Sequence, residues 1–242
     1  MSAYRRIASA VRTLNLDKPI HSMAGALCGV ATDEAVFHLT FDDGPNPDVT
    51  PSVLDALDEF GAPATFFLLT SNAQEHPDLA QEILRRGHVI GLHSRTHPRL
   101  SHVSWQVLQD EILAARRDLE ETIGARVTWF RPPYGVHGAR SIAMTRKARL
   151  TTMLWTVDSR DYKGITADPL ERTRAVIKPG GVVLLHDRPV GDSLADDAER
   201  GLIPKEELTR VYLRELTERG LRAVDADALF SAGRPLKKLK LG

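Results

Sequence analysis

Residues 36–45 read Val36-Phe37-His38-Leu39-Thr40-Phe41-Asp42-Asp43-Gly44-Pro45. The run over residues 36–41 is rich in β-branched and aromatic side chains, which predicts a buried β-strand. Two adjacent carboxylates, Asp42 and Asp43, follow it, and Gly44-Pro45 then requires a sharp turn. Short apolar runs that end in polar residues recur along the chain, and this recurrence indicates the fold.

From residue 35 onward, apolar runs alternate with longer runs of helical period. We predict strands over residues 36–41, 64–69, 88–93, 127–131, 151–157, 182–186 and 221–224. We predict helices over residues 51–60, 77–86, 105–123, 141–147, 169–177 and 205–219. Strands joined by helices pair in parallel, so this order predicts an α/β fold. A TIM-barrel-like (β/α) barrel of about seven parallel strands is favoured, and an open doubly wound sheet is the alternative.

One main domain is expected, because no Gly/Ser/Pro-rich linker divides the chain. It should span residues 35–230, after a helical N-terminal extension over residues 1–34. Residues 231–242 contain Lys237, Lys238 and Lys240, so we expect a basic, solvated and mobile C-terminal tail there.

Composition narrows the class of function. Lys and Arg total 32, as do Asp and Glu, and a net charge of zero gives no support to a nucleic-acid partner. The apolar segments near the N-terminus are short or interrupted by polar residues, so we expect no integral membrane segment. A single cysteine, Cys28, suits a reducing compartment. We therefore expect a cytoplasmic protein, with a divergent export signal as the alternative.

Polar residues collect at the carboxyl ends of the predicted strands, namely Asp42, Asp43, His93, Arg131, Asp158 and His186. In (β/α) barrels this rim carries the active site. A random scatter of polar groups would not choose the same end of the strands repeatedly, so we expect these side chains to converge.

Two histidines and a carboxylate offer the donors of a metal site. His93 and His97 are four residues apart and would share a face if the strand leads into a helical turn. The adjacent Asp42 and Asp43 are costly to crowd unless a cation or a proton offsets their charge. Taken alone, the Asp42-Asp43-Gly44 stretch is also compatible with a surface Asp-Gly turn. The His93 and His97 spacing is also compatible with two unrelated surface histidines.

Acid–base and oxyanion groups are also available. The apolar run 181–185 brings His186 out of a buried strand, where an imidazole can be tuned for proton transfer near neutral pH. Arg131 is a natural carboxylate partner. After Pro132-Pro133, the backbone N–H groups of Tyr134 and Gly135 could face an oxyanion. The alternatives are that His186 is a structural histidine bonded to the backbone and that Arg131 forms a structural salt bridge.

Five stretches, taken together and in order, resemble the motifs of the polysaccharide deacetylase family that carries the NodB homology domain (carbohydrate esterase family 4). They are Thr40-Phe41-Asp42-Asp43-Gly44-Pro45, His93-Ser94-Arg95-Thr96-His97, Arg131-Pro132-Pro133-Tyr134-Gly135, Trp155-Thr156-Val157-Asp158-Ser159-Arg160-Asp161-Tyr162 and Leu184-Leu185-His186-Asp187. The resemblance covers residues 35–230. Five ordered motifs are far more specific than any one of them.

The resemblance implies a distorted (β/α) barrel and a set of site residues. Asp43, His93 and His97 would bind one divalent metal, with zinc expected and cobalt as the alternative. Asp42 would be the catalytic base, held by Arg131, and His186 the acid, tuned by Asp161. Leu184 would line the acetyl pocket, and the Tyr134 amide would face the oxyanion. Tyr162 would shield the site, at a position where the family usually has Trp.

The function implied is hydrolysis of the N-acetyl group of an N-acetylated sugar. No clear export signal is visible, which favours an intracellular glycan, glycolipid or sugar intermediate as the substrate. An O-acetyl esterase, a related imide or ureide hydrolase, and a non-catalytic carbohydrate-binding relative are the alternatives.

Overall fold

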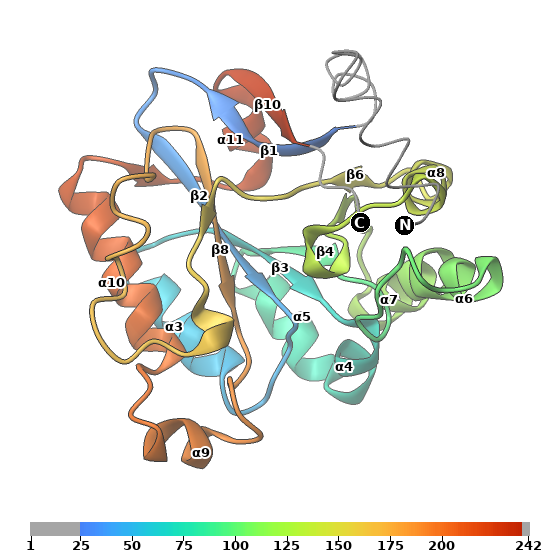
Figure 1. The fold of residues 1–242 in the computed structure, drawn as a ribbon, viewed down its shortest axis with the longest axis horizontal. Coiled ribbons are helices and arrows are strands. Elements are labelled where there is room, and N and C mark those ends of the chain that lie inside the picture. Colours follow the sequence, from blue (N-terminus) through green and yellow to red (C-terminus); the bar gives the residue numbers. More distant parts are fainter. Residues whose placement is uncertain (1–24, 239–242) are drawn as a thin grey trace, which may run out of the picture.

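The computed structural model describes residues 25–238 and shows a curled sheet with helices packed along its outer side (Figure 1). The strands are β1 (Ala26–Ala31), β2 (Val36–Asp42), β3 (Ala64–Leu68), β4 (Val89–Leu92), β5 (Trp129–Phe130), β6 (Thr151–Thr152), β7 (Val157–Asp158), β8 (Gly181–His186), β9 (Arg222–Ala223) and β10 (Arg234–Lys238). The α-helices are α3 (Thr50–Glu59), α4 (Thr70–Glu75), α5 (Pro77–Arg85), α6 (Trp105–Gln109), α7 (Ala115–Ile123), α8 (Ala139–Lys147), α9 (Leu194–Glu199), α10 (Lys205–Glu218) and α11 (Ala226–Ser231). A π-helical turn, Asp110–Ala114, joins α6 to α7.

The sheet has the order β10-β1-β8-β2-β3-β4-β5-β6, with β7 beside β8 and β9 beside β2. Every pairing among β2 to β9 is parallel, as the alternation of strands and helices predicted. Strand β1 is antiparallel to β8, and a bridge between Leu27 and Met153 connects it to the segment after β6. Because β1 spans the gap between the two ends of the parallel sheet, the architecture is a distorted (β/α) barrel.

Strand β2 shows how the sequence divides between the two faces of the sheet. Phe37, Leu39 and Phe41 belong to the main apolar core, which the outer helices cover. His38 and Thr40 alternate with them and are completely buried on the other face. Their polar atoms are satisfied there, since Thr40 Oγ1 donates to the Val183 carbonyl at 2.7 Å and His38 lies 2.7 Å from the Val224 carbonyl. His38 is therefore a packed core histidine.

Both expectations for the chain ends need correction. Residues 26–31 form strand β1, so they are not part of a helical extension, and residues 1–24 lie outside the described residues. Residues 234–238 pair with β1 as strand β10, so this part of the chain is not a mobile tail. Local composition could not reveal this pairing, because it joins segments about two hundred residues apart along the chain.

Two element predictions were wrong in detail. Residues 169–176 form successive turns and not a regular α-helix, because the Leu170 and Thr173 carbonyls each accept N–H groups from both three and four residues later. The expected strand over residues 151–157 is two short strands, β6 and β7. Helices α3, α5, α7 and α10 are each followed by a glycine with positive φ, namely Gly61, Gly87, Gly124 and Gly220, which ends the helix in a left-handed conformation. No helix within the described residues has the length and apolar character to cross a membrane.

Candidate active site

The carboxyl ends of β2, β4, β5 and β8 bring the predicted polar residues together. Asp42 is the last residue of β2 and is 3% exposed. Asp43 has φ 79°, so the chain turns left-handed there and the two adjacent carboxylates can serve one site. In a continued strand their side chains would point to opposite faces. The left-handed angle at Asp43 therefore explains how two consecutive residues can place both carboxylates at the same site.

Gly44 and Asp187 support this turn. A Cβ on Gly44 would overlap the buried Asp187 carboxylate, so this position excludes any side chain. Thr50 Oγ1 donates to Asp187 Oδ2 at 2.7 Å, and Asp187 Oδ1 has no hydrogen-bond partner among the described residues. Burial raises the pKa of Asp187 to about 7.

The histidine loop differs in form from the prediction. His93 follows β4 directly, but residues 93–97 do not form a helical turn, since Ser94 and His97 have φ 75° and 65°. The two imidazole rings still lie side by side, with centroids 5.0 Å apart. The Ser94 Oγ accepts the His97 N–H at 3.0 Å and holds this compact loop.

Glu111, in the π-helical turn, was missed by the sequence reasoning. It is buried, and its carboxylate accepts the backbone N–H groups of Arg95 and Thr96 at 2.8 and 3.0 Å and the Thr96 hydroxyl at 2.6 Å. It therefore fixes the loop between the two histidines from a distant element. The predicted helix over residues 105–123 contained no sign of this inward-facing acid.

Asp43, His93 and His97 form a site that can hold a metal ion. Asp43 Oδ1 lies 3.4 Å from His93 Nε2 and 3.5 Å from His97 Nε2, and it is buried with no hydrogen-bond partner among the described residues. Ligand atoms about 2.0–2.1 Å from a tetrahedral zinc would be roughly 3.3 Å apart. One potential ligand atom from each residue lies within 4.8 Å of the others. The residues therefore fit a divalent cation.

The hydrogen bond of His93 and the charge states of His97 and Asp43 suit the same ion. His93 Nδ1 lies 2.7 Å from the Arg131 carbonyl, so Nδ1–H donates to it and Nε2 keeps its lone pair toward Asp43. Burial lowers the pKa of His97 to about 4, which keeps this imidazole neutral. Burial also opposes ionisation of Asp43, but the nearby imidazoles and Arg188 outweigh it and lower the pKa of that carboxyl.

Arg131 holds Asp42, as predicted. Arg131 Nη1 donates to Asp42 Oδ1 at 2.7 Å and to Thr40 Oγ1 at 2.8 Å, and the guanidinium is completely buried. Its Nε donates to the Met153 carbonyl, and it stacks over the Phe67 ring at 4.1 Å. This leaves Asp42 Oδ2 facing the metal-binding residues, 3.7 Å from His93 Nε2.

His186 and Asp161, which were expected to act together, form a hydrogen-bonded pair. His186 Nδ1 donates to Asp161 Oδ1 at 2.7 Å, and the His186 backbone N–H donates to Asp161 Oδ2 at 3.0 Å. Burial opposes the imidazolium, but the Asp161 charge and hydrogen bond outweigh it and raise the pKa of His186 to about 9. His186 is therefore protonated at neutral pH, as a general acid must be.

Two tyrosines flank the site, each against one histidine. Tyr134 is 44% exposed, with φ 62°, and packs edge-on against His97 with ring centroids 4.6 Å apart. Tyr162 is 47% exposed and packs likewise against His186 at 5.4 Å. Leu184 is buried in β8, two residues before His186 and therefore on the same side of the strand.

A cavity of about 130 Å³ adjoins these groups. Asp43, His186 and Tyr162 line it, together with Arg188, Pro189, Val190 and Lys205. The sequence reasoning missed Arg188 and Lys205. Arg188 Nη1 lies 3.6 Å from Asp43 Oδ2, and its position two residues after His186 could have indicated it. Lys205 is 44 positions from its partner Asp161, and no local pattern connects the two.

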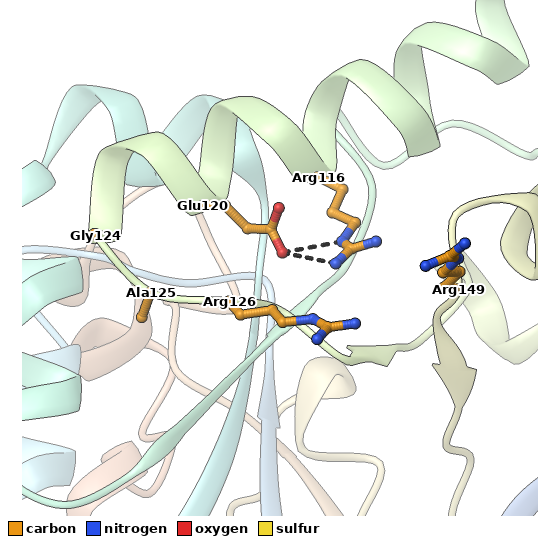
Figure 2. Close-up of a pocket in the computed structure, with 6 residues that line it drawn as sticks. All are labelled: Arg116, Glu120, Gly124, Ala125, Arg126 and Arg149. Carbon is orange, nitrogen blue, oxygen red and sulfur yellow. Dashed lines mark hydrogen bonds and ion pairs between the residues drawn. The ribbon is translucent and has the colours of Figure 1, made fainter.

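A larger and shallower hollow lies at the amino ends of β5 and β6, where it is lined by Arg116, Glu120, Gly124, Ala125, Arg126 and Arg149 (Figure 2). Arg116 pairs with Glu120 there at 2.8 Å. Its lining contains no histidine and no pair of carboxylates, so it offers neither a metal site nor a base and acid. The convergence of reactive groups at the opposite strand ends identifies the candidate active site.

Comparisons with known proteins agree with this geometry. A family model described as polysaccharide deacetylase matches residues 29–153. The chain is 32% identical over 209 residues to a peptidoglycan-N-acetylglucosamine deacetylase of Bacillus cereus, an alignment covering 85% of this chain and 72% of the relative. It is 37% identical over 161 residues to a chitooligosaccharide deacetylase of Sinorhizobium fredii, covering 66% and 75% of the two chains.

A solved structure is similar over nearly the whole described chain. It is a peptidoglycan N-acetylglucosamine deacetylase in complex with 4-naphthalen-1-yl-N-oxidanyl-benzamide. The two superpose with a TM-score of 0.78 at 28% sequence identity, covering 89% of this chain and 97% of the other. The likeness therefore extends to the complete barrel.

Proposed function

Because this chain belongs to the polysaccharide deacetylase family, we propose that it is a metal-dependent hydrolase that removes the N-acetyl group from an N-acetylated sugar. One observation carries the proposal: Asp43 Oδ1 lies within 3.5 Å of two imidazole Nε2 atoms and makes no hydrogen bond among the described residues. Asp42 and His186, a base and an acid, flank that point.

Zinc is the proposed metal, because a carboxylate and two imidazoles are ligands that it commonly takes, and cobalt is the alternative. When bound, the ion would act as a Lewis acid toward the acetyl carbonyl and lower the pKa of a water molecule. Asp43, His93 and His97 would hold it, and three protein ligands leave room for water and substrate.

Asp42 is the proposed base. Arg131 ties up Oδ1 and leaves Oδ2 to accept the proton of the attacking water. The same hydrogen bond, together with the buried guanidinium, fixes the orientation of the Asp42 carboxylate. Asp42 is not among the three metal-binding residues, which leaves it available for proton transfer.

His186 is the proposed acid. An amine is a poor leaving group, so the sugar nitrogen must receive a proton as the C–N bond breaks. The imidazolium, stabilised by Asp161, supplies it from Nε2, because Nδ1 is occupied by that carboxylate. We also propose that the Tyr134 amide faces the oxyanion, that Leu184 lines the acetyl pocket and that Tyr162 shields the site.

The proposed substrate is a glycan with N-acetylglucosamine units. The relatives named above act on peptidoglycan N-acetylglucosamine or on chitooligosaccharides. The exposed Tyr162 ring beside His186 offers an apolar face on which a sugar ring can pack, whereas Arg99 lies over the Tyr134 ring, 4.4 Å from its centroid. Cytoplasmic location and a glycolipid or sugar intermediate as substrate stay predictions from the sequence.

The function is tested by acetate release from N-acetylglucosamine oligomers with the zinc-loaded protein. Chelation should abolish release, and added zinc should restore it. The matched O-acetylated sugars are measured in parallel, since faster release from them would favour the esterase alternative. No acetate from either class by zinc-loaded protein would contradict the proposal.

Three variants separate the roles of the site residues. Asp42→Asn should keep about one bound zinc and lose roughly 10²–10⁴-fold in kcat, because the base is gone and the ligands remain. His93→Ala and His97→Ala should lose zinc as well as activity. Metal content is measured by elemental analysis on the same samples. Full turnover in Asp42→Asn would refute its assignment as the base.

A further inference from the structure

Lys205 is a buried lysine that enters the active site from a distant element. It is the first residue of α10 and is 6% exposed. Its Nζ donates to Asp161 Oδ2 at 2.8 Å and to the Asp161 backbone carbonyl at 3.1 Å. Burying an ammonium group is costly unless it is paired and hydrogen-bonded. The two contacts with Asp161 meet this condition for Lys205.

The two oxygens of the Asp161 carboxylate contact different cations, the His186 imidazolium and the Lys205 ammonium. Oδ1 accepts from His186 Nδ1 and from Ser159 Oγ at 2.9 Å. Oδ2 accepts from Lys205 Nζ and from the His186 backbone N–H. Each oxygen therefore has two donors, and rotation of the carboxylate would break bonds on both sides. Lys205 is the only member of this set that comes from α10.

The charges of Asp161 and Lys205 affect how readily the His186 imidazolium releases its proton. A carboxylate paired only with His186 would hold the imidazolium strongly and make it a weak acid. The Lys205 ammonium on the same carboxylate weakens the attraction between Asp161 and the imidazolium. The other charged groups that face His186 are Asp42 and Asp43 at the end of β2 and Arg188 after β8.

We propose that Lys205 is a positioning residue for proton donation, which fixes the Asp161 carboxylate against His186 and shares its negative charge. This inference rests on the proposed function, since it assigns Lys205 to the acid of that reaction. Lys205 acts through Asp161, and it also lines the cavity beside His186 and Asp43.

The test compares Lys205→Met, which keeps the length of the side chain and removes its charge, with Lys205→Arg, which restores a cation. For Lys205→Met we expect kcat at pH 7.5 to fall on the order of 10-fold. The alkaline limb of the kcat/KM profile should move up by about one pH unit, because the unshared carboxylate holds the proton more tightly. Lys205→Arg should recover part of both changes.

A matched control is Arg210→Met on the same helix, which removes the surface ion pair with Glu59 and should leave the profile unchanged. If Lys205→Met does not fold, Lys205→Gln is measured in its place, since it keeps a donor and lacks the charge. An unchanged alkaline limb with normal kcat overturns the proposal. A loss of kcat without movement of the limb also overturns it, because that result indicates a structural role only.

A second readout does not depend on acetate release. The titration of the His186 ring is followed by NMR in the zinc-loaded wild-type and Lys205→Met proteins. An upward shift supports the charge-sharing role even if no substrate is turned over, in which case the proposed function fails and this inference survives. Identical titrations in the two proteins contradict the inference while leaving the hydrolase assignment intact.

Discussion

At the scale of single residues, one left-handed backbone angle decides whether two adjacent carboxylates can act together. Asp43, at φ 79°, directs its carboxylate to the histidines, and Asp42 keeps its place beside Arg131. The two acids therefore have different neighbours and different proposed roles. Asp43 Oδ1 faces two imidazole nitrogens, which suits Asp43 for binding a cation, and its other oxygen, Oδ2, lies 3.6 Å from Arg188. Asp42 is hydrogen-bonded to Arg131, which suits it for proton transfer.

Asp161→Asn tests the tuning of the acid at this scale. The raised pKa of His186, about 9, means that the imidazolium persists to alkaline pH and that activity should fall as pH rises through this value. Without the carboxylate, burial is opposed only by the charges of Asp42 and Asp43, so the pKa of His186 should drop from about 9 toward the ordinary value of about 6.5. At pH 7.5 about a tenth of the molecules would then carry the proton, so we expect a roughly 10-fold loss.

The measurement for Asp161→Asn is kcat/KM against pH. Its alkaline limb should move to lower pH, opposite to the movement expected for Lys205→Met. Ser159→Ala removes the uncharged partner of Asp161 Oδ1 and serves as the comparison, with a much smaller displacement expected. An Asp161→Asn profile that coincides with wild type would show that this carboxylate does not tune the acid.

At the scale of secondary-structure elements, the π-helical turn Asp110–Ala114 positions the histidine loop. The turn places Glu111 inward, where it accepts the N–H groups of Arg95 and Thr96. Single π-helical turns inside α-helices are frequently found at functional sites. Here the turn supplies a rigid anchor for a loop whose own backbone has two left-handed residues.

Glu111→Gln should weaken metal binding without unfolding the protein. Glutamine keeps the shape but offers one acceptor oxygen where glutamate offers two, so part of the loop is released. We expect the zinc Kd to rise about 10- to 100-fold, the range for loss of outer-shell support. Competition with a chelating dye measures it. Glu121→Gln, on the exposed side of α7, is the control, and equal affinities in the two variants would count against the anchoring role.

At the scale of the whole molecule, the barrel buries several histidines away from the proposed metal site. Burial lowers the pKa values of His38, His88 and His137 to about 4 in each case. The folded protein therefore binds fewer protons than the unfolded chain, whose histidines titrate near 6.5. Their stabilising contribution is complete above that pH and is lost as pH falls from about 6.5 toward 4.

We accordingly expect the free energy of unfolding to decrease by a few kcal/mol, as an order of magnitude, between pH 7 and pH 4.5. Asp187, whose pKa is raised to about 7, acts in the opposite sense, but it is one group against three. Urea unfolding midpoints across this range measure the effect. His38→Gln should reduce the pH dependence and His102→Gln should not. A constant midpoint would contradict this account.

Much of the site could be predicted from residue order, because strand ends in a parallel barrel meet at one rim. Which of these residues pair was implied by the resemblance to the deacetylase family, and the contacts Asp42–Arg131 and Asp161–His186 and the grouping of Asp43 with His93 and His97 agree with it. Lys205, Glu111 and Arg188 were not predicted. Lys205 and Glu111 lie in helices, and the residues next to them in sequence do not indicate that they contact Asp161 and the loop over residues 93–97, respectively.

The sequence by itself determined a parallel α/β fold and the strand ends at which the polar residues gather, because periodicity and strand-end polarity are local properties of the chain. The tertiary structure decided how the barrel closes, through β1 and β10, and how the acid is held, through Lys205. Both depend on pairings between segments remote in the chain. Such pairings follow from the packed geometry of the barrel, which no local window of residues encodes.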